Sequence, residues 1–525
     1  MKDRSTLRWG GVWAGVSGAL LALAFPRADL CAVAFVALVP FLLSLQDVPA
    51  VTALFRGYAC GAVFFTSLLY WIPGVMVTYG GMSGVLAWPI FLLLVFYLAT
   101  YVAVFALLQA ASWRRFGEPA LVLAPVGWVA LEIVRGRLLT GFPWGLIGYS
   151  QYRDIPLLQT AAWGGICAVS FVVVAANAGI VLLVLRPARP RPLICGAALL
   201  LLVALAHAYG VLTIRAGERG PGGESIPVAA VQGNVPQDRK WIPGSGARIL
   251  SDLVRLTREA GAGGARLIVW PESSSPYSFR RPAPAGAAGP GVETDKAYLS
   301  VVRDLARAFG ATLILGSVDY KVVDGDLRVF NSAFAVEPDG SLGGSYDKIH
   351  LVPFGEYVPL HRLLFFVDRL AQGTISDFTP GTVAAPLPTG VGRAATFICY
   401  EAIFPAVVRR VAGKDAALLV NITNDAWFGT TAAPLQHLAM ATVRAAENRR
   451  FMVRAANTGI SAIIDPYGRI LERTPLMKSA VLRGTVQTRA DVTPYAACGD
   501  LFAWGCAILT LLHGAALRAA FLRRG

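Results

Sequence analysis

The stretch TFICYEAIFP, residues 396–405, decides how the second half of this chain is to be understood. It begins as an apolar run typical of a buried strand, and Cys399 stands where that run ends. Two further stretches also place a polar residue just after an apparent strand. LIVWPES (267–273) contains Glu272, and YDKIHLVPFGEYVP (346–359) contains Lys348. An acid, an amine and a thiol are the groups that acyl transfer through a thioester requires.

From residue 226 onward, short apolar runs alternate with helical stretches. Apolar runs of about four to eight residues bounded by Gly, Pro, Asn or Asp are strand signals. Helices are expected at 247–260, 294–309 and 434–447. Alternating strands and helices favour an α/β sandwich. The expected strands are IPVAAVQGN, ARLIVWPES, ATLILGSVDY, RVFNSAFAVEPDG, AATFICYEA, AALLVNITND, RFMVRAANTG and SAIIDPYGRI.

The remainder of the chain is strongly apolar. The whole sequence is 55% hydrophobic and 15% charged, whereas a soluble domain has roughly 25% charged residues. Only six of the 32 acidic residues come before residue 215. Because a membrane helix needs about 20 apolar residues, we predict a polytopic α-helical membrane domain of about eight spans. The expected spans are 9–25, 30–46, 53–75, 84–111, 118–135, 157–185, 193–214 and 498–520.

The predicted organisation follows from this division of apolar and polar sequence. A membrane domain occupies residues 1–214, and a Gly- and Pro-containing linker occupies 215–225. The catalytic α/β domain occupies 226–490, and the eighth span follows at 498–520.

Basic residues in the short loops predict the topology, because such loops are enriched in Lys and Arg on the cytoplasmic side. Both termini are expected in the cytoplasm, since Arg56, Arg114–Arg115 and the arginines of 186–191 then all lie inside. The α/β domain would lie outside, which in a bacterium means the periplasm. The net charge of +15 is explained by these loops, and no nucleic-acid motif accompanies it.

One predicted outer loop departs from this rule. Glu132, Arg135, Arg137 and Arg153 cluster there, beside GFPWG at 141–145. Two interpretations remain open. Arg135 and Arg137 bind a lipid phosphate head group, or Glu132 and Arg135 form a local pair at helical spacing.

Cysteine usage singles out Cys399. Of the seven cysteines, it is the one inside the predicted soluble region, which excludes a disulfide framework or a cysteine-based metal site there. A lone cysteine is either a nucleophile or a small apolar core side chain. No metal or nucleotide motif is present, so we predict no cofactor.

The expected chemistry requires a base for the thiol. Glu272, at the end of an apolar strand, is placed to accept its proton, and Lys348 would stabilise the thiolate and then the oxyanion. The backbone amide of Tyr400 is a second candidate oxyanion donor. His350 is the one serious rival base among the five histidines, and we interpret it as structural.

Together the three stretches resemble the nitrilase superfamily, carbon–nitrogen hydrolases with a Glu–Lys–Cys triad on an αββα sandwich. The resemblance covers about residues 226–490 and includes QGNVPQDRKW (232–241) and NITNDAWFG (421–429). With its membrane spans, the whole chain is similar to the membrane branch of that superfamily, which N-acylates bacterial lipoproteins. The resemblance implies that Cys399 is the nucleophile, with Glu272 as general base and acid and Lys348 as oxyanion stabiliser.

The same resemblance implies roles for five more residues. Glu356 matches an additional glutamate that helps to hold the catalytic group. Tyr400 and Glu401 match residues that follow the nucleophile and support the site. Trp241 and Trp427 match tryptophans of the active-site surroundings.

The implied reaction is ping-pong. Cys399 attacks the sn-1 ester of a phospholipid, typically phosphatidylethanolamine. The thioester then acylates the α-amine of an S-diacylglyceryl-cysteine apolipoprotein, the last step of lipoprotein maturation.

The apolar arm at 358–370 is either a lid or an ordinary packed helix. The protein is expected to be a monomer.

Two other functions remain in view. A membrane-anchored amidase would hydrolyse a small amide and use its spans only as an anchor. An inert membrane scaffold or transporter would leave the acid, the amine and the thiol without a purpose.

Overall fold

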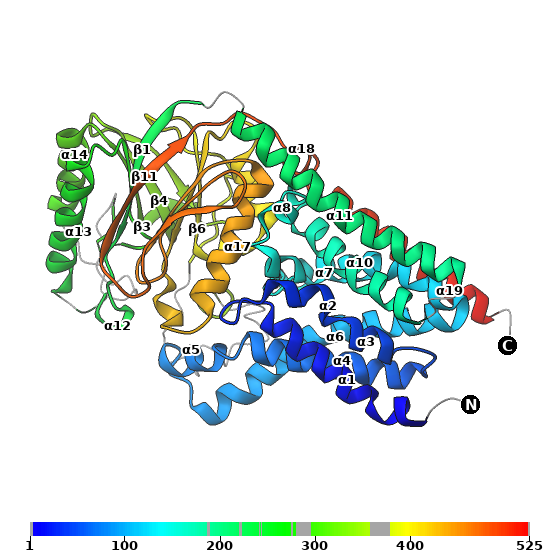
Figure 1. Cartoon of the computed structure of the whole chain (residues 1–525). Coiled ribbons are helices and arrows are strands. Elements are labelled where there is room, and N and C mark those ends of the chain that lie inside the picture. Colours follow the sequence, from blue (N-terminus) through cyan, green and yellow to red (C-terminus); the bar gives the residue numbers. More distant parts are fainter. Residues whose placement is uncertain are drawn as a thin grey trace. The chain divides into compact units, whose positions relative to one another are not determined.

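The computed structural model describes residues 4–185, 189–219, 223–240, 242, 244–274, 277–279, 296–357 and 378–522 (Figure 1). The chain divides into two compact units. The helical unit comprises Met1–Pro73, Gly84–Arg219 and Cys498–Gly525. The sandwich unit comprises Gly74–Ser83 and Gly220–Ala497.

In the helical unit, five of the described helices are long and apolar enough to cross a membrane. They are α4 (Ala50–Leu68), α6 (Gly84–Phe116), α10 (Ile166–Leu185), α11 (Pro190–Arg219) and α19 (Leu501–Leu522). Two shorter apolar helical segments, Trp9–Leu23 and Cys31–Ser44, precede them. The other helices are α1 (Arg4–Leu23), α2 (Ala34–Ala37), α3 (Val39–Ser44), α7 (Ala124–Arg135), α8 (Ile155–Leu158) and α9 (Ala161–Gly164), and α5 (Ile72–Thr78) runs from this unit into the sandwich unit.

The number of spans remains a prediction. Where a fifth span was expected at 118–135, a 3-10 segment (Glu118–Leu123) leads into α7, which has only 12 residues. That length is well short of the roughly 20 residues that cross a bilayer.

The sandwich unit contains two sheets that face each other, with β1 against β8 and β4 against β6. The six-stranded sheet has the order β11-β1-β2-β3-β4-β5, and the five-stranded sheet has the order β10-β9-β8-β7-β6. Strands β1, β2 and β3 are parallel, as are β6, β7 and β8. The strands are β1 (Ser225–Gln232), β2 (Leu267–Val269), β3 (Thr312–Val323), β4 (Asp326–Val336), β5 (Leu342–Asp347), β6 (Ala394–Ile398), β7 (Leu418–Thr423), β8 (Met452–Ala456), β9 (Ala462–Ile464), β10 (Ile470–Arg473) and β11 (Ala480–Gln487).

Helices cover both sheets, which confirms the predicted αββα sandwich. On the six-stranded sheet lie α13 (Ser245–Ala262) and α14 (Lys296–Phe309), drawn side by side in Figure 1. On the five-stranded side lie α16 (Pro405–Ala412) and α17 (Ala433–Asn448). α13, α14 and α16 each bury an apolar stripe, whereas nearly every residue of α17 is buried. The remaining helices are α12 (Gln237–Lys240) and α18 (Pro494–Cys498).

Most of the strands form where the apolar runs predicted them, because a strand covered on both faces has no polar side. All residues of β2, β6, β7 and β8 are buried. Trp270 follows β2 in the core, and its Nε1 donates to Thr257 Oγ1 of α13 at 2.9 Å. This contact ties the outer helix to the strand that precedes Glu272.

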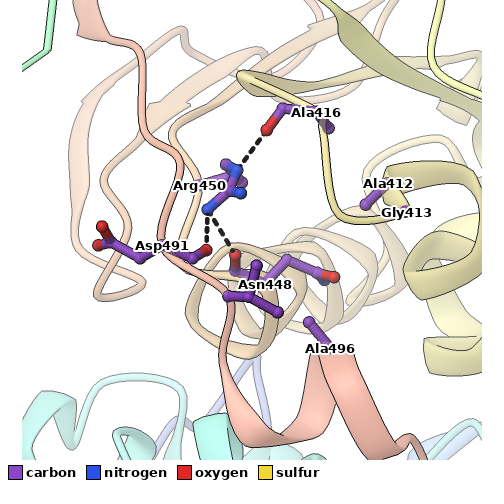
Figure 2. A pocket seen from close by; sticks show the side chains of 8 residues that line it. Ala412, Gly413, Ala416, Asn448, Arg450, Asp491 and Ala496 are labelled. Atoms are coloured by element: carbon purple, nitrogen blue, oxygen red, sulfur yellow. Dashed lines mark hydrogen bonds between the residues drawn. The ribbon is translucent and has the colours of Figure 1, made fainter.

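A buried arginine, Arg450, lines a hollow at the end of α17. Figure 2 shows Arg450 donating hydrogen bonds to backbone oxygens from three different segments. Its Nε reaches Ala416 O at 2.5 Å, and its Nη1 reaches Asn448 O at 3.3 Å and Asp491 O at 2.5 Å. The guanidinium therefore joins these segments, and we interpret the hollow as structural.

Candidate active site

The sandwich brings the acid, the amine and the thiol to one place. Glu272 follows β2 and Trp270, and Lys348 directly follows β5. Cys399 is the first residue of the 3-10 segment η5 (Cys399–Ile403), immediately after β6. Their exposed fractions are 6%, 1% and 8%, so all three groups are removed from bulk water.

Three donors hold the Glu272 carboxylate. Lys348 Nζ donates to its Oε1 at 3.2 Å, and Asn331 Nδ2 donates to the same oxygen at 2.7 Å. The backbone N–H of Asn424 donates to Oε2 at 2.9 Å. A glycine at position 316 allows β3 to pass close by, because a Cβ there would lie 2.6 Å from Glu272 Cα. The carboxylate is thus fixed from both sheets.

Glu356 forms the second carboxylate around the same ammonium. Lys348 Nζ donates to Glu356 Oε1 at 2.9 Å, as does Asn331 Nδ2 at 2.9 Å. The backbone N–H of Val352 donates to Glu356 Oε2 at 2.8 Å. Burial opposes the charge on Lys348, but Glu272 and Glu356 outweigh it and raise the pKa of Lys348. Lys348 is therefore a permanent cation between two carboxylates.

Cys399 is held in an unusual conformation. Its φ is 49°, in the left-handed region that residues other than glycine seldom adopt. Burial, and then the charge of Glu272, raise the pKa of the Cys399 thiol, while Lys348 opposes this. The resting group is the neutral thiol, so its reaction as a nucleophile requires a base.

Glu401 links the nucleophile turn to the lysine segment. Its Oε1 accepts hydrogen bonds from Tyr346 Oη at 2.8 Å and from the backbone N–H groups of Ile349 at 2.8 Å and His350 at 3.1 Å. Its Oε2 accepts from the backbone N–H of Ile398 at 2.7 Å. The Glu401 carboxylate therefore joins the segment that carries Lys348 to the segment that carries Cys399.

His350, the rival base, packs as an apolar ring. Its centroid lies 3.7 Å from that of Phe404 and 5.9 Å from that of Tyr400. Burial, with the nearby Lys348 and Arg410 charges, lowers the pKa of His350 to about 4. Its placement agrees with the structural interpretation of this residue.

This shift predicts a pH-dependent stability. Because the pKa of His350 is lowered in the folded protein, the unfolded chain binds its proton more tightly, and stability falls as pH drops from about 6.5 to 4. At pH 5, this preference of the proton for the unfolded chain lowers the free energy of unfolding by about 2 kcal/mol. His350→Phe retains a ring and should lose less stability between pH 7 and pH 5 than the wild type in thermal unfolding. Equal losses in the two proteins would contradict this.

Lys240 was not singled out from the sequence, although it lies in the QGNVPQDRKW stretch. It is 1% exposed, and its Nζ donates to the backbone oxygen of Glu272 at 3.4 Å. Burial lowers the pKa of Lys240 to about 8, although the negative charges of Glu272 and Cys399 act to raise it. Asn331 was missed as well, since an amide on a strand carries no sequence signal.

Of the two predicted tryptophans, Trp427 is among the residues that the structure describes. Trp241 lies outside the described residues, as does the arm at 358–370. Trp427 lies in the 3-10 segment η6 (Asp425–Phe428) and is partly exposed. Its ring meets that of Tyr79 edge to face, with centroids 5.2 Å apart.

The arginines of the predicted outer loop lie in the helical unit. Arg135 is 4% exposed, and its guanidinium donates to the backbone oxygens of Trp144 at 2.7 Å and Gly145 at 3.2 Å. Arg137 pairs with Asp500 and remains partly exposed. Glu132 accepts from the backbone N–H of Ile147 at 2.8 Å. Arg135 therefore holds the GFPWG loop, and Arg137 is the more accessible arginine.

Two family models match this chain. The carbon-nitrogen hydrolase model matches residues 227–495, and the model of the apolipoprotein N-acyltransferase N-terminal domain matches residues 17–179.

Curated relatives match nearly end to end. The apolipoprotein N-acyltransferase of Geobacter metallireducens is 40% identical, over 97% of this chain and 94% of its own length. Those of Azotobacter vinelandii and Pseudomonas aeruginosa are 37% and 36% identical, each over 93% of this chain and 91% of their own length. The chain therefore belongs to the apolipoprotein N-acyltransferase family, in the carbon–nitrogen hydrolase superfamily.

Proposed function

We propose that this protein transfers a fatty acyl chain from a membrane phospholipid to the N-terminal α-amine of diacylglyceryl-cysteine apolipoproteins, through a thioester on Cys399. The observation that carries the proposal is the buried Glu272–Lys348–Glu356 cluster beside a buried free thiol. The names and end-to-end similarity of the relatives supply the substrate classes.

In the first half-reaction, Glu272 accepts the thiol proton as Cys399 Sγ attacks the sn-1 ester carbonyl. The C–S bond forms, and the negative charge on the carbonyl oxygen is stabilised by Lys348 with the backbone amide of Tyr400. When the C–O bond breaks, Glu272 returns the proton to the leaving glycerol oxygen. The products are a lysophospholipid and the acyl-enzyme.

In the second half-reaction, the neutral α-amine of the acceptor attacks the thioester carbonyl. The N–C bond forms, the C–S bond breaks, and Glu272 moves the amine proton to the departing sulfur. Glu356 and Asn331 keep Lys348 and Glu272 in place through both steps, since they share the same hydrogen-bond network.

Large exposed apolar residues that are close in sequence to site residues favour a lipid donor over a small amide. Ile242, Phe354 and Trp427 are large, apolar and exposed, and we call them the apolar rim. Ile242 follows Lys240 by two residues, Phe354 precedes Glu356 by two, and Trp427 is in η6 beside Asn424. Such a rim suits an acyl chain, with Trp241 and the arm at 358–370 as further candidates to contact it.

The finer assignments follow from the sequence. We place residues 1–214 and 498–520 in the bacterial inner membrane, both termini in the cytoplasm, and the catalytic domain at 226–490 in the periplasm. Phosphatidylethanolamine is the proposed preferred donor, Arg137 a proposed head-group contact, and the protein a proposed monomer.

Intact-mass measurement tests the proposal. After incubation with phosphatidylethanolamine, the purified protein should gain one fatty-acyl mass, and a diacylglyceryl-cysteine peptide should remove it. Cys399→Ala should gain nothing, whereas Cys498→Ala, which removes an exposed thiol elsewhere, should be acylated normally. A folded wild type that never gains the mass but hydrolyses small amides would favour the amidase.

A further inference from the structure

Lys240 is a second lysine at the general base. It is the last residue of α12 and is 1% exposed. Its Nζ donates to the backbone oxygen of Glu272 at 3.4 Å, whereas Lys348 donates to the carboxylate of the same residue at 3.2 Å. Two ammonium groups therefore contact Glu272, one at its main chain and one at its side chain.

Asn424 connects the segment that carries Lys240 to the base. Its Nδ2 donates to Oε1 of Gln237, the first residue of α12, at 2.8 Å. Its backbone N–H donates to Glu272 Oε2 at 2.9 Å. At the other end of α12, the backbone oxygen of Lys240 accepts from Ser245 Oγ at 3.2 Å. Contacts at both ends of α12 therefore fix the position from which Lys240 reaches Glu272.

The buried groups around the base contain more acids than cations. Lys348 is shared by the carboxylates of Glu272 and Glu356, and one cation with two carboxylates leaves a net charge of −1. Glu401 is a further buried acid in the nucleophile turn. When the Cys399 thiol passes its proton to Glu272, one carboxylate disappears and one thiolate appears. The excess of negative charge is therefore unchanged by the proton transfer and moves to the sulfur.

The Lys240 ammonium can offset this excess. The neighbouring cation Arg454 already has its own carboxylate, since its Nη2 donates to Asp425 Oδ2 at 2.8 Å. Burial lowers the pKa of Lys240 to about 8, so most of it is protonated at pH 7. The charges of Glu272 and Cys399 act against burial, so the ammonium lies within electrostatic range of both. In a site removed from water, such a charge is only weakly screened.

We propose that Lys240 is a positioning residue that holds the backbone of Glu272 and supplies the positive charge that offsets the thiolate when Glu272 takes the proton of Cys399. As Sγ then attacks the ester carbonyl, the negative charge passes from sulfur to the carbonyl oxygen and stays within the same buried site. Lys348, shared between two carboxylates, is thus assisted by a second cation. The inference rests on the proposed role of Cys399 as nucleophile.

Two alkylating reagents of similar size and different charge test the proposal. Iodoacetate and iodoacetamide are reacted with the full-length protein at pH 7, and the alkylated Cys399 peptide is quantified by mass spectrometry. The ratio of the two rates reports the charge near the sulfur, whereas a change in access affects both rates alike. In Lys240→Met, the iodoacetate-to-iodoacetamide ratio should fall by about tenfold. Arg239→Met removes an exposed cation from the same helix and should change the ratio by less than about twofold.

Lys240→Gln separates the charge from the hydrogen bond, because it retains a donor toward the backbone of Glu272. Its ratio should fall as far as that of Lys240→Met, and it decides the question if Lys240→Met does not fold. A wild-type ratio in either folded variant would overturn the proposal. The assay needs no acyl donor, so it remains informative even if the protein never forms an acyl-enzyme, the result that would refute the proposed function.

The same variants connect the charge to the reaction. Single-turnover acylation of Cys399, followed by intact mass, should slow by about tenfold in Lys240→Gln and stay at the wild-type rate in Arg239→Met. A folded Lys240→Gln protein that has a lowered reagent ratio but acylates at the wild-type rate would remove Lys240 from the proposed reaction.

Discussion

Glu272→Gln is expected to slow acylation of Cys399 by about 10³-fold, because the thiol would lose its general base. The thiol is neutral at rest, since burial and the Glu272 charge raise its pKa. Glutamine has the size of glutamate but cannot accept the proton. Single-turnover formation of the acyl-enzyme, followed by intact mass, measures the effect.

The control for this variant separates chemistry from folding. Glutamine must turn its NH₂ toward either Asn331 or the Asn424 N–H, both of which donate to Glu272, so a destabilisation of about 1–3 kcal/mol is also expected. Glu259→Gln changes an exposed carboxylate paired with Arg483 and should acylate at the wild-type rate. A folded Glu272→Gln protein that acylates within tenfold of the wild type would remove Glu272 from the role of base.

Lys348→Met is expected to abolish acylation and to destabilise the sandwich by about 3–5 kcal/mol. The substitution leaves Glu272 and Glu356 facing each other without their shared cation, both still bonded to Asn331. Thermal unfolding should show the loss at pH 8. It should show less at pH 5, because protonation of one carboxyl relieves the repulsion.

A second substitution tests this explanation. Lys348→Met combined with Glu356→Gln removes one of the two charges, so it should recover part of the lost stability without recovering acylation. Arg393→Met breaks an exposed ion pair with Asp415 and should cost less than about 1 kcal/mol. If the double variant were no more stable than Lys348→Met, repulsion between the carboxylates would not explain the loss.

Three strands are missing from the sequence prediction, and all three are sheet edges. β10, of which only Ile470 was included in a predicted run, is one edge of the five-stranded sheet, and its residues are exposed or partly buried. β5 and β11 are the two edges of the six-stranded sheet, and most of their residues are only partly buried. An edge strand need not be apolar throughout, so LGGSYD and AVLRGTVQ resemble loops in the sequence. Their pairing with β4 and β1 depends on neighbours that lie elsewhere in the chain.

By itself, the sequence determined which segments are buried strands, which are long apolar helices, and which acid, amine and thiol stand at strand ends. These are local properties, visible in composition and period. Only the tertiary structure decided which residues hold the acid, the amine and the thiol in place through hydrogen bonds. Asn424 and Glu272 are 152 residues apart, and His437 is 38 residues from the Cys399 oxygen that it contacts. Such pairs are created by the packing of two sheets, and no local pattern encodes them.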